Sequence, residues 1–317
     1  MERFIRGCAW EGTGDVPYPR ADPADATRLP GDTWAVAQLP VGVRVEFVGD
    51  APAVEIEYTT ATDDLGYRGD GAGRRFELWR DGACVSAAPA VLGAGVARLT
   101  TGDGTGRCIV YLPEGMRPNL LSLTATAGAI EPAPAQPRWL VYGDSIAEGW
   151  VASAPSGAWP AVAGRTLGFD VVNCGYGGSA RGEVASAEQL AAVPADVVSV
   201  SHGTNCWTRI PHSAAMAAAG MQAFLTVLRQ GHPTTPIVVV SPVLRPDAES
   251  AANRLGATLA DLRRAIEGVA TAHGDVTLVP GLPLLDASLL ADGIHPGDAG
   301  HRVLAVEIGA AVQRCLR

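Results

Sequence analysis

The sequence predicts a chain of two domains, an all-β sandwich followed by an α/β domain with a parallel sheet. Three observations lead to this prediction: alternating apolar residues in the first part, a short proline-rich stretch, and a rhythm of strands and helices in the remainder. The 317 residues suffice for two domains of ordinary size, and with 47% hydrophobic residues the chain can bury a sizeable core.

The first part, residues 1 to about 130, shows the two-residue period of half-buried strands. The run 53–59 alternates cleanly between apolar and polar residues, 75–80 does so too, and Asp81-Gly82 then suits a hairpin turn. Further short runs, separated by Gly and Asp, lie at 41–48, 94–100, 107–112 and 120–127. Several short strands at this spacing favour a jelly-roll-like sandwich.

A short connector separates the two parts. Residues 131–137 read Glu-Pro-Ala-Pro-Ala-Gln-Pro, and their three prolines favour a stiff, extended chain. We therefore predict domains at residues 1–130 and 138–317, joined by this linker.

From residue 138 onward, short apolar strands alternate with helical patterns. The predicted strands are 139–142, 170–173, 196–201, 236–241 and 276–279, and the clearest helices are 213–229, 251–272 and 298–315. This rhythm predicts a parallel sheet covered on both faces. In such sheets ligands bind beyond the C-terminal ends of the strands, so the residues there are the candidates for chemistry.

Charge and hydropathy argue against two classes of binding partner, nucleic acids and membranes. The net charge is −9, and the 24 Lys and Arg residues form no basic patch, so nucleic acid is not an expected partner. No stretch approaches the ~20 apolar residues of a membrane span, and residues 1–6 lead into no apolar run of signal length. We expect a cytoplasmic protein without a membrane partner, of undetermined oligomeric state.

The cysteines and histidines show no pattern typical of a metal site. No C-x-x-C pair occurs among the six cysteines, and the histidines have no ligand-like spacing. We expect neither a metal nor an organic cofactor.

Polar residues follow four of the predicted strands. Gly143-Asp144-Ser145 follows the first, a glycine-rich turn at 173–178 the second, Gly203-Thr204-Asn205 the third, and Asp292-Gly-Ile-His295 the fifth. A serine is a weak nucleophile until a base such as histidine takes its proton, and a carboxylate orients that base. Glycine N–H groups and an asparagine amide can stabilise the oxyanion of a tetrahedral intermediate. The four blocks together therefore suit acyl transfer.

The same blocks resemble those of the SGNH hydrolases, or GDSL esterases, and occur in the order of that family. The resemblance implies a flavodoxin-like, three-layer α/β domain in which Ser145 is the nucleophile and Asp292 and His295 complete a catalytic triad. It also implies an oxyanion hole formed by the backbone N–H groups of Ser145 and Gly178 and by the side-chain amide of Asn205.

Two blocks depart from the family pattern. Cys206 stands where an Asp usually follows the asparagine, and Ser179-Ala180-Arg181 stands where an acidic residue is usual. We expect activity to survive the first change, because that Asp is not a triad residue, although the loop that shapes the pocket can differ. A β domain before the hydrolase domain is similar to the layout of family 2 carbohydrate esterases, which deacetylate sugars. That likeness rests on domain order alone.

Simpler interpretations exist for each block. Ser145 would also serve as a helix N-cap, and Asp292-Gly293 would serve as an ordinary turn. Gly175 and Gly177 compete with Gly178 for the oxyanion role, and Asn205 could be a turn residue. His202, close to Asn205, is a rival base or a buried structural histidine.

Several residues near the blocks could form a substrate pocket. Trp150, Tyr176 and Trp207 each lie close behind a block, and they either line the pocket or pack in the core. Arg181 and Arg209 either contact an acidic substrate or are solvated surface residues.

We therefore predict a serine esterase that removes a small acyl group, chiefly acetyl, from a sugar or related polyol through an acyl-enzyme on Ser145. The expected partner is a small-molecule or saccharide ester. One alternative is an acyltransferase that uses the same triad with an alcohol in place of water. Another is a carbohydrate-binding protein whose hydrolase half is inactive.

Overall fold

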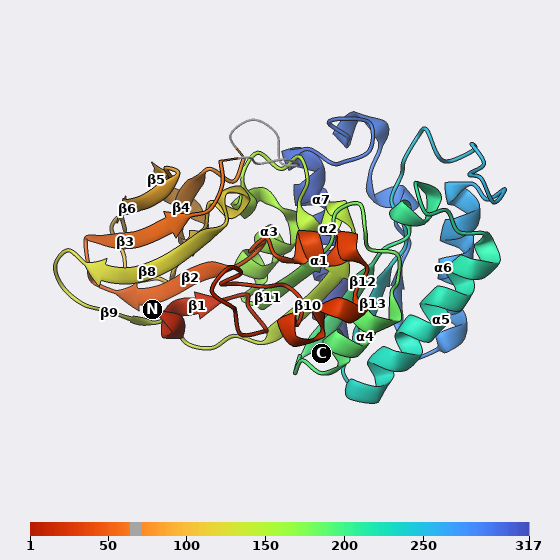
Figure 1. The fold of residues 1–317 in the computed structure, drawn as a ribbon, viewed down its shortest axis with the longest axis horizontal. Coiled ribbons are helices and arrows are strands. Elements are labelled where there is room, and N and C mark those ends of the chain that lie inside the picture. The colour runs from red at the N-terminus through yellow and green to blue at the C-terminus, as the bar shows by residue number, and fades with distance from the viewer. Residues whose placement is uncertain (64–71, 317) are drawn as a thin grey trace.

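The computed structural model describes residues 1–63 and 72–316, so residue 317, the end of the predicted second domain, lies outside it. An all-β region lies beside an α/β region, and both termini lie on the same side of the molecule in the view of Figure 1. This arrangement confirms the predicted fold class of a β domain that precedes an α/β domain.

The β region is a sandwich of two antiparallel sheets. The larger sheet has the order β1-β2-β7-β4-β5, with β9 paired to β2, and the smaller has the order β6-β3-β8. The bounds are β1 Ile5–Arg6, β2 Arg44–Gly49, β3 Ala53–Thr60, β4 Arg75–Arg80, β5 Ala83–Pro89, β6 Gly93–Thr100, β7 Cys108–Tyr111, β8 Pro118–Ala125 and β9 Ile130–Pro132. Phe47, Ile56, Phe76 and Leu99 belong to the buried core of this region.

Three strands of the sandwich, β1, β5 and β9, have no counterpart in the sequence analysis, and β5 is the longest of them. β5 lies at the end of the larger sheet, and most of its residues are exposed. An edge strand without a buried face has no apolar alternation, which is the signal that identified the other strands.

The α/β region is built on a five-stranded parallel sheet in the order β11-β10-β12-β13-β14. Its strands are β10 Arg138–Gly143, β11 Asp170–Gly175, β12 Val197–Ser201, β13 Ile237–Val240 and β14 Thr277–Val279. Counted within this region the order is 2-1-3-4-5, which is that of flavodoxin-like folds. The order reverses between β10 and β12, and ligands bind beside such a reversal in folds of this kind.

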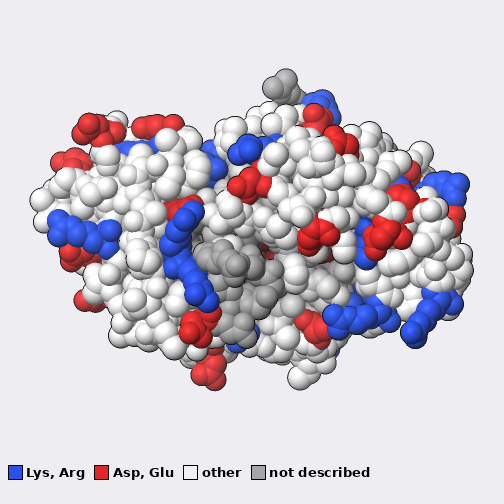
Figure 2. Space-filling model, turned by 90° about the horizontal axis from the view of Figure 1, so that it is seen from above, with Lys and Arg blue, Asp and Glu red and all other residues white. Residues whose placement is uncertain are grey.

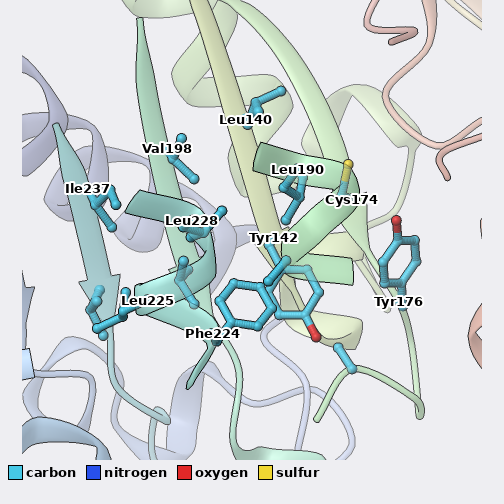
Figure 3. Packing of buried hydrophobic residues seen from close by; sticks show 14 of the residues in the cluster. Leu140, Tyr142, Cys174, Tyr176, Leu190, Val198, Phe224, Leu225, Leu228 and Ile237 are labelled. Atoms are coloured by element: carbon cyan, nitrogen blue, oxygen red, sulfur yellow. The ribbon is translucent and has the colours of Figure 1, made fainter. Parts of the chain in front are cut away.

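Helices cover both faces of the parallel sheet. They are α2 Ser145–Glu148, α3 Trp159–Leu167, α4 Val184–Ala191, α5 Ala214–Gly231, α6 Leu259–His273 and α7 Asp298–Cys315. Leu140 and Tyr142 of β10 share a core with Phe224 of α5, and Tyr142 and Phe224 lie ring to ring in Figure 3. Trp139 and Ile308 belong to the opposite core, so alternate residues of β10 enter different layers.

The helix predicted at 251–272 starts later than expected. α6 begins at Leu259, where Thr258 and Asp261 form a capping box. Just before it, the Asn253 side chain accepts hydrogen bonds from the backbone N–H groups of Leu255 and Ala257 at 2.9 and 3.1 Å. These contacts satisfy the backbone donors locally. They hold residues 253–257 in a turn, so the helix cannot extend to these residues.

The N-terminal segment, residues 9–37, packs largely against the α/β region, although Tyr18 packs against the core of the sandwich. It contains a 3₁₀ helix at Pro23–Arg28 and the helix α1 Gly31–Ala37. Its residues Ala21, Leu29 and Ala37 are buried in the same core as Leu140. In Figure 1 the segment, red to orange, runs from the sandwich across to the parallel sheet.

A buried ion pair also joins the two regions. Arg44 of β2 contacts Asp170 at the start of β11 at 2.9 Å, with side chains 6% and 10% exposed. Arg44 also donates to the carbonyl of Val171 at 3.0 Å.

On the face seen in Figure 2, acidic and basic side chains are interspersed over the described surface. Within residues 1–63 and 72–316, no helix has the length and apolar character that a bilayer crossing requires.

Candidate active site

Ser145 is the first residue of α2, immediately beyond the end of β10. Asp144 caps this helix by accepting a hydrogen bond from the backbone N–H of Ile146 at 3.0 Å. Gly149, in the left-handed conformation at φ 94°, ends the helix after one turn. Gly143 is required before it, because a Cβ there would lie 2.5 Å from Ala147 Cβ. The tight turn holds Ser145 at the carboxyl edge of the sheet.

A chain of hydrogen bonds joins the three residues predicted as a triad. Ser145 Oγ lies 2.8 Å from His295 Nε2, and His295 Nδ1 lies 2.7 Å from Asp292 Oδ2. The other oxygen of Asp292 accepts the backbone N–H groups of Ile294 and His295 at 2.9 and 2.7 Å. These contacts fix the carboxylate relative to the imidazole.

The surroundings favour an ionised Asp292. Burial acts to raise the pKa of Asp292, but the hydrogen bonds from the backbone and imidazole of His295 outweigh it, so the pKa lies below its usual value. The side chain is 44% exposed, whereas that of His295 is 12% exposed. An ionised carboxylate at this position selects the tautomer that leaves Nε2 free to accept a proton.

The glycine-rich turn after β11 offers one open backbone donor. The N–H of Gly175 donates to Asn173 Oδ1 at 2.8 Å, and that of Gly177 to Glu148 Oε2 at 2.9 Å. Within the described residues, the N–H of Gly178 has no hydrogen-bond partner. A Cβ on Gly178 would also meet no atom within 4 Å, so the space beside it is open. Of the three glycines, Gly178 is therefore free to donate to a ligand.

Asn205 lies four residues beyond the end of β12, in a 3₁₀ turn at Thr204–Trp207. Its side-chain amide donates to the carbonyl of Ala180 at 3.3 Å, and the side chain is buried. An amide nitrogen carries two N–H groups, so one remains for another acceptor. The three oxyanion candidates therefore all follow strands at the carboxyl edge of the parallel sheet. There Ser145, Gly178 and Asn205 can supply hydrogen bonds to an oxyanion.

The chain matches the model of the GDSL-like lipase/acylhydrolase family over residues 141–303, just over half of its length. The chain belongs to this family. A search of curated proteins found no match.

Solved structures with the same fold cover 86–100% of the chain. The salicylyl-acyltransferase SsfX3 from a tetracycline biosynthetic pathway is 24% identical, with a TM-score of 0.84 over 99% of this chain and 96% of that one. A family two carbohydrate esterase from Clostridium thermocellum, in complex with cellohexaose, is 15% identical, with a TM-score of 0.65 over 86% and 92%. The acetyl xylan esterase Est2A from Butyrivibrio proteoclasticus is 15% identical, with a TM-score of 0.65 over 100% and 97%. Family and fold make this protein an enzyme, a hydrolase of the SGNH type.

Four residues are candidates for the pocket of this GDSL-like hydrolase: Trp150, Tyr176, Trp207 and Arg181. Of these, Trp150 contacts the candidate base. Its ring stacks on that of His295, with centroids 5.2 Å apart and an interplanar angle of 28°. Its indole N–H donates to Glu148 at 2.9 Å. Trp150 thus supports the imidazole from one side.

The other three pocket candidates are engaged elsewhere. Tyr176 is buried in the core shown in Figure 3, and its hydroxyl donates to the carbonyl of Arg20 at 2.6 Å. Trp207 donates to the carbonyl of Ala251 at 2.8 Å. Arg181 is ion-paired with Asp32 at 2.9 Å, and its side chain is only 9% exposed. Packing and pairing therefore account for these three side chains.

His202 and Cys206 lie beside the GDSL-like blocks, and both are buried. His202 is buried against Tyr142 and Phe224, and burial lowers the pKa of its imidazole to about 4. Its ring nitrogens have no hydrogen-bond partner among the described residues, contrary to the hydrogen-bonded state expected of a structural histidine.

Burial raises the pKa of the Cys206 thiol to about 12, so this departure from the family pattern adds no second nucleophile at neutral pH. Arg209 is exposed.

Glu148 and Arg20 were missed by sequence reasoning. Both are buried, and they form an ion pair at 2.6 Å although 128 residues separate them. No motif joins positions that far apart, and neither residue belongs to one of the four blocks. Within residues 1–63 and 72–316, no group of three or more His, Cys, Asp or Glu side chains could hold a metal ion.

Proposed function

We propose that the protein is a serine esterase that removes a small acyl group, with acetyl the leading choice, from a sugar or related polyol. The observation that carries this proposal is the unbroken hydrogen-bond chain from Ser145 through His295 to Asp292. An arrangement of this kind activates a serine for attack on an ester carbonyl.

Acylation would proceed in two steps. His295 Nε2 takes the proton of Ser145 Oγ as this oxygen forms a bond to the carbonyl carbon, and the oxyanion receives hydrogen bonds from the N–H groups of Ser145 and Gly178 and the amide of Asn205. The tetrahedral intermediate then collapses, the bond to the alcohol oxygen breaks, and the imidazolium of His295 protonates that oxygen.

Deacylation would repeat the sequence with water. His295 takes a proton from water as its oxygen attacks the acyl carbon, and the bond to Ser145 Oγ breaks as His295 returns the proton to the serine. The products are the free acid and the alcohol.

The choice of substrate is supported by two observations. The structural neighbours include an acetyl xylan esterase and a family two carbohydrate esterase. The sequence also contains no long apolar run that could form a lid over a lipid chain.

Acyl transfer to an alcohol acceptor is the second candidate. It is favoured by the likeness to a salicylyl-acyltransferase, which extends over nearly the whole of both chains with a TM-score of 0.84. The two reactions share the acyl-enzyme and differ in whether water or an alcohol attacks it. Adding glycerol or a monosaccharide during turnover separates them, since a transferase forms a new ester and releases less free acid.

The test is hydrolysis of p-nitrophenyl acetate, butyrate and octanoate by wild type, Ser145→Ala and the control Ser288→Ala, which changes an exposed serine. We expect turnover to be fastest on acetate, to vanish in Ser145→Ala and to persist in the control. A fluorophosphonate probe should label wild type but not Ser145→Ala. A folded wild type that neither turns over any ester nor takes the label would reject the esterase and leave the binding protein.

A further inference from the structure

The guanidinium of Arg20 connects the N-terminal segment to the carboxyl edge of the parallel sheet. Its side chain is 1% exposed, and it donates to the carbonyl of Val36 in its own segment and to that of Leu39 just beyond it, both at 2.7 Å. It also donates to the carbonyl of Gly175, the last residue of β11, and to Glu148 at 2.6 Å. A planar, multivalent donor of this kind fixes several groups at once, which an ammonium cannot do equally well.

Glu148 receives this contact at the end of α2, the helix that starts with Ser145. One of its oxygens accepts from Arg20, and the other accepts from the indole of Trp150 and the backbone N–H of Gly177, both at 2.9 Å. The carboxylate is fully buried, so these hydrogen bonds act in a medium of low dielectric constant.

The two groups held by Glu148 adjoin different parts of the proposed site. Trp150 stacks on His295, the candidate base. Gly177 directly precedes Gly178, whose N–H is the open backbone donor of the turn. A shift of Glu148 would therefore move the support of the base and the oxyanion donor together.

We infer that Arg20 is a positioning residue for the reaction: through Glu148 it sets the positions of Trp150 and of the Gly177–Gly178 turn, so that the N-terminal segment completes the active site. This inference rests on the proposed function, because it assigns its roles to His295 and Gly178. Displacement of reacting groups by about 1 Å can cost about 100-fold in rate. Loss of Arg20 should therefore lower kcat much more than it changes KM.

The chain offers two matched controls. Arg28 of the same segment pairs with Glu188 of α4, but these side chains are 55% and 41% exposed. Arg44 makes a buried pair with Asp170, at the opposite end of β11 from the catalytic edge. Arg28→Gln tests the loss of an arginine from the segment, and Arg44→Gln tests the loss of a buried contact between the regions.

The experiment measures kcat and KM for p-nitrophenyl acetate with Arg20→Gln, Arg20→Lys and both controls, on protein shown to be folded by circular dichroism. We expect about a 100-fold lower kcat for Arg20→Gln, with KM changed less than about threefold. Arg20→Lys keeps the positive charge but not the planar set of guanidinium donors, so its kcat should fall about tenfold. It should also fold if Arg20→Gln does not. Both controls should keep the wild-type kcat.

A second readout does not depend on turnover. The proton on His295 Nδ1, hydrogen-bonded to Asp292 and close to the ring of Trp150, should give a low-field ¹H NMR signal that is absent from His295→Gln. We expect this signal to move in both Arg20 variants and to stay in place in Arg28→Gln and Arg44→Gln.

The outcomes separate the two proposals. If wild type hydrolyses no ester, the proposed function fails, and the NMR signal still decides whether Arg20 positions the site. Wild-type kcat and an unmoved signal in both Arg20 variants would overturn the inference. So would an equal loss of kcat in Arg44→Gln, because that result would mean that any buried contact between the regions has the same effect.

Discussion

The two ends of strand β11 invite comparison, because a buried arginine from the N-terminal half contacts each of them. At the amino end Arg44 pairs with Asp170, and at the carboxyl end Arg20 donates to the carbonyl of Gly175 and pairs with Glu148. Both contacts join the same two parts of the chain and are similarly buried. They differ in what their acidic partners hold.

Asp170 accepts hydrogen bonds from Arg44 and from the backbone N–H of Gly7, so its contacts tie the β region to the sheet. Glu148 holds Trp150 and Gly177, which adjoin the proposed reacting groups. The comparison predicts that the edge of the sheet at which a buried pair lies decides whether its loss affects stability alone or function as well. In such sheets ligands bind beside the loops that follow the strands, so contacts at the opposite edge are expected to stabilise the fold.

Among variants that keep Ser145, the largest expected effect at the carboxyl edge comes from Asp292→Asn. An amide in place of the carboxylate can favour the wrong tautomer of His295, and we expect kcat to fall about 10⁴-fold. The measurement is kcat on p-nitrophenyl acetate. Asp286→Asn is the matched control, since Asp286 caps a turn in the same part of the chain. Equal losses in the two variants would contradict the role assigned to Asp292.

At the amino edge, Arg44→Gln should act on stability. Breaking a buried ion pair leaves Asp170 without its main partner, and we expect the free energy of unfolding to fall by about 3–5 kcal/mol. Urea denaturation measures this change. The comparison between the two edges breaks down if the folded variant also loses kcat.

Asn205→Ala tests the oxyanion role at the carboxyl edge. Removing one preorganised donor costs about 10²–10³ in kcat in other enzymes, and we expect a loss in that range with little change in KM. Asn253→Ala, which changes an asparagine in a turn before α6, should keep the wild-type kcat. If Asn205→Ala retains full activity, the oxyanion is stabilised by backbone donors alone.

The smallest effect concerns His202, which follows β12 at the same edge but lies in the core. The folded pKa is lowered to about 4 by burial, while the unfolded histidine titrates near 6.5. Below about pH 6.5 only the unfolded state binds this proton, so stability falls as the pH drops, until the folded pKa is reached.

We expect His202 to account for about 2 kcal/mol of lost stability between pH 7.5 and 5. Urea denaturation of wild type and His202→Phe at both pH values measures it, and the variant should lose less on acidification. The phenyl ring would pack against Tyr142 and Phe224. Equal losses in the two proteins would show that His202 does not remain neutral in the fold.

The parallel sheet and the serine site were accessible from the sequence for a common reason. Central strands such as β10 and β12 are buried on both faces, so they appear as apolar runs, and the residues that follow them can be compared directly with known motifs. The position of Asp292 relative to His295 could likewise be predicted, because only two residues separate them.

The parts of the fold and of the site that the sequence did not predict depend on contacts between distant residues, which local sequence patterns do not encode. Residues 9–37 are largely irregular, and they are ordered by packing on another region, so they show no period of their own. The pairing of Arg20 with Glu148 joins positions 128 residues apart. The choice among Gly175, Gly177 and Gly178 likewise required knowing which N–H groups are already bonded.

The course of residues 9–37 limits how freely the two halves can be recombined. A cut in the stretch 131–137 would appear to release an independent catalytic module. It would instead uncover part of the core that Ala21, Leu29 and Ala37 share with the α/β region, and would leave Glu148 without Arg20. Chimeras that exchange the β half for that of a relative should therefore transfer residues 9–37 with the hydrolase half, as an N-terminal arm of that half.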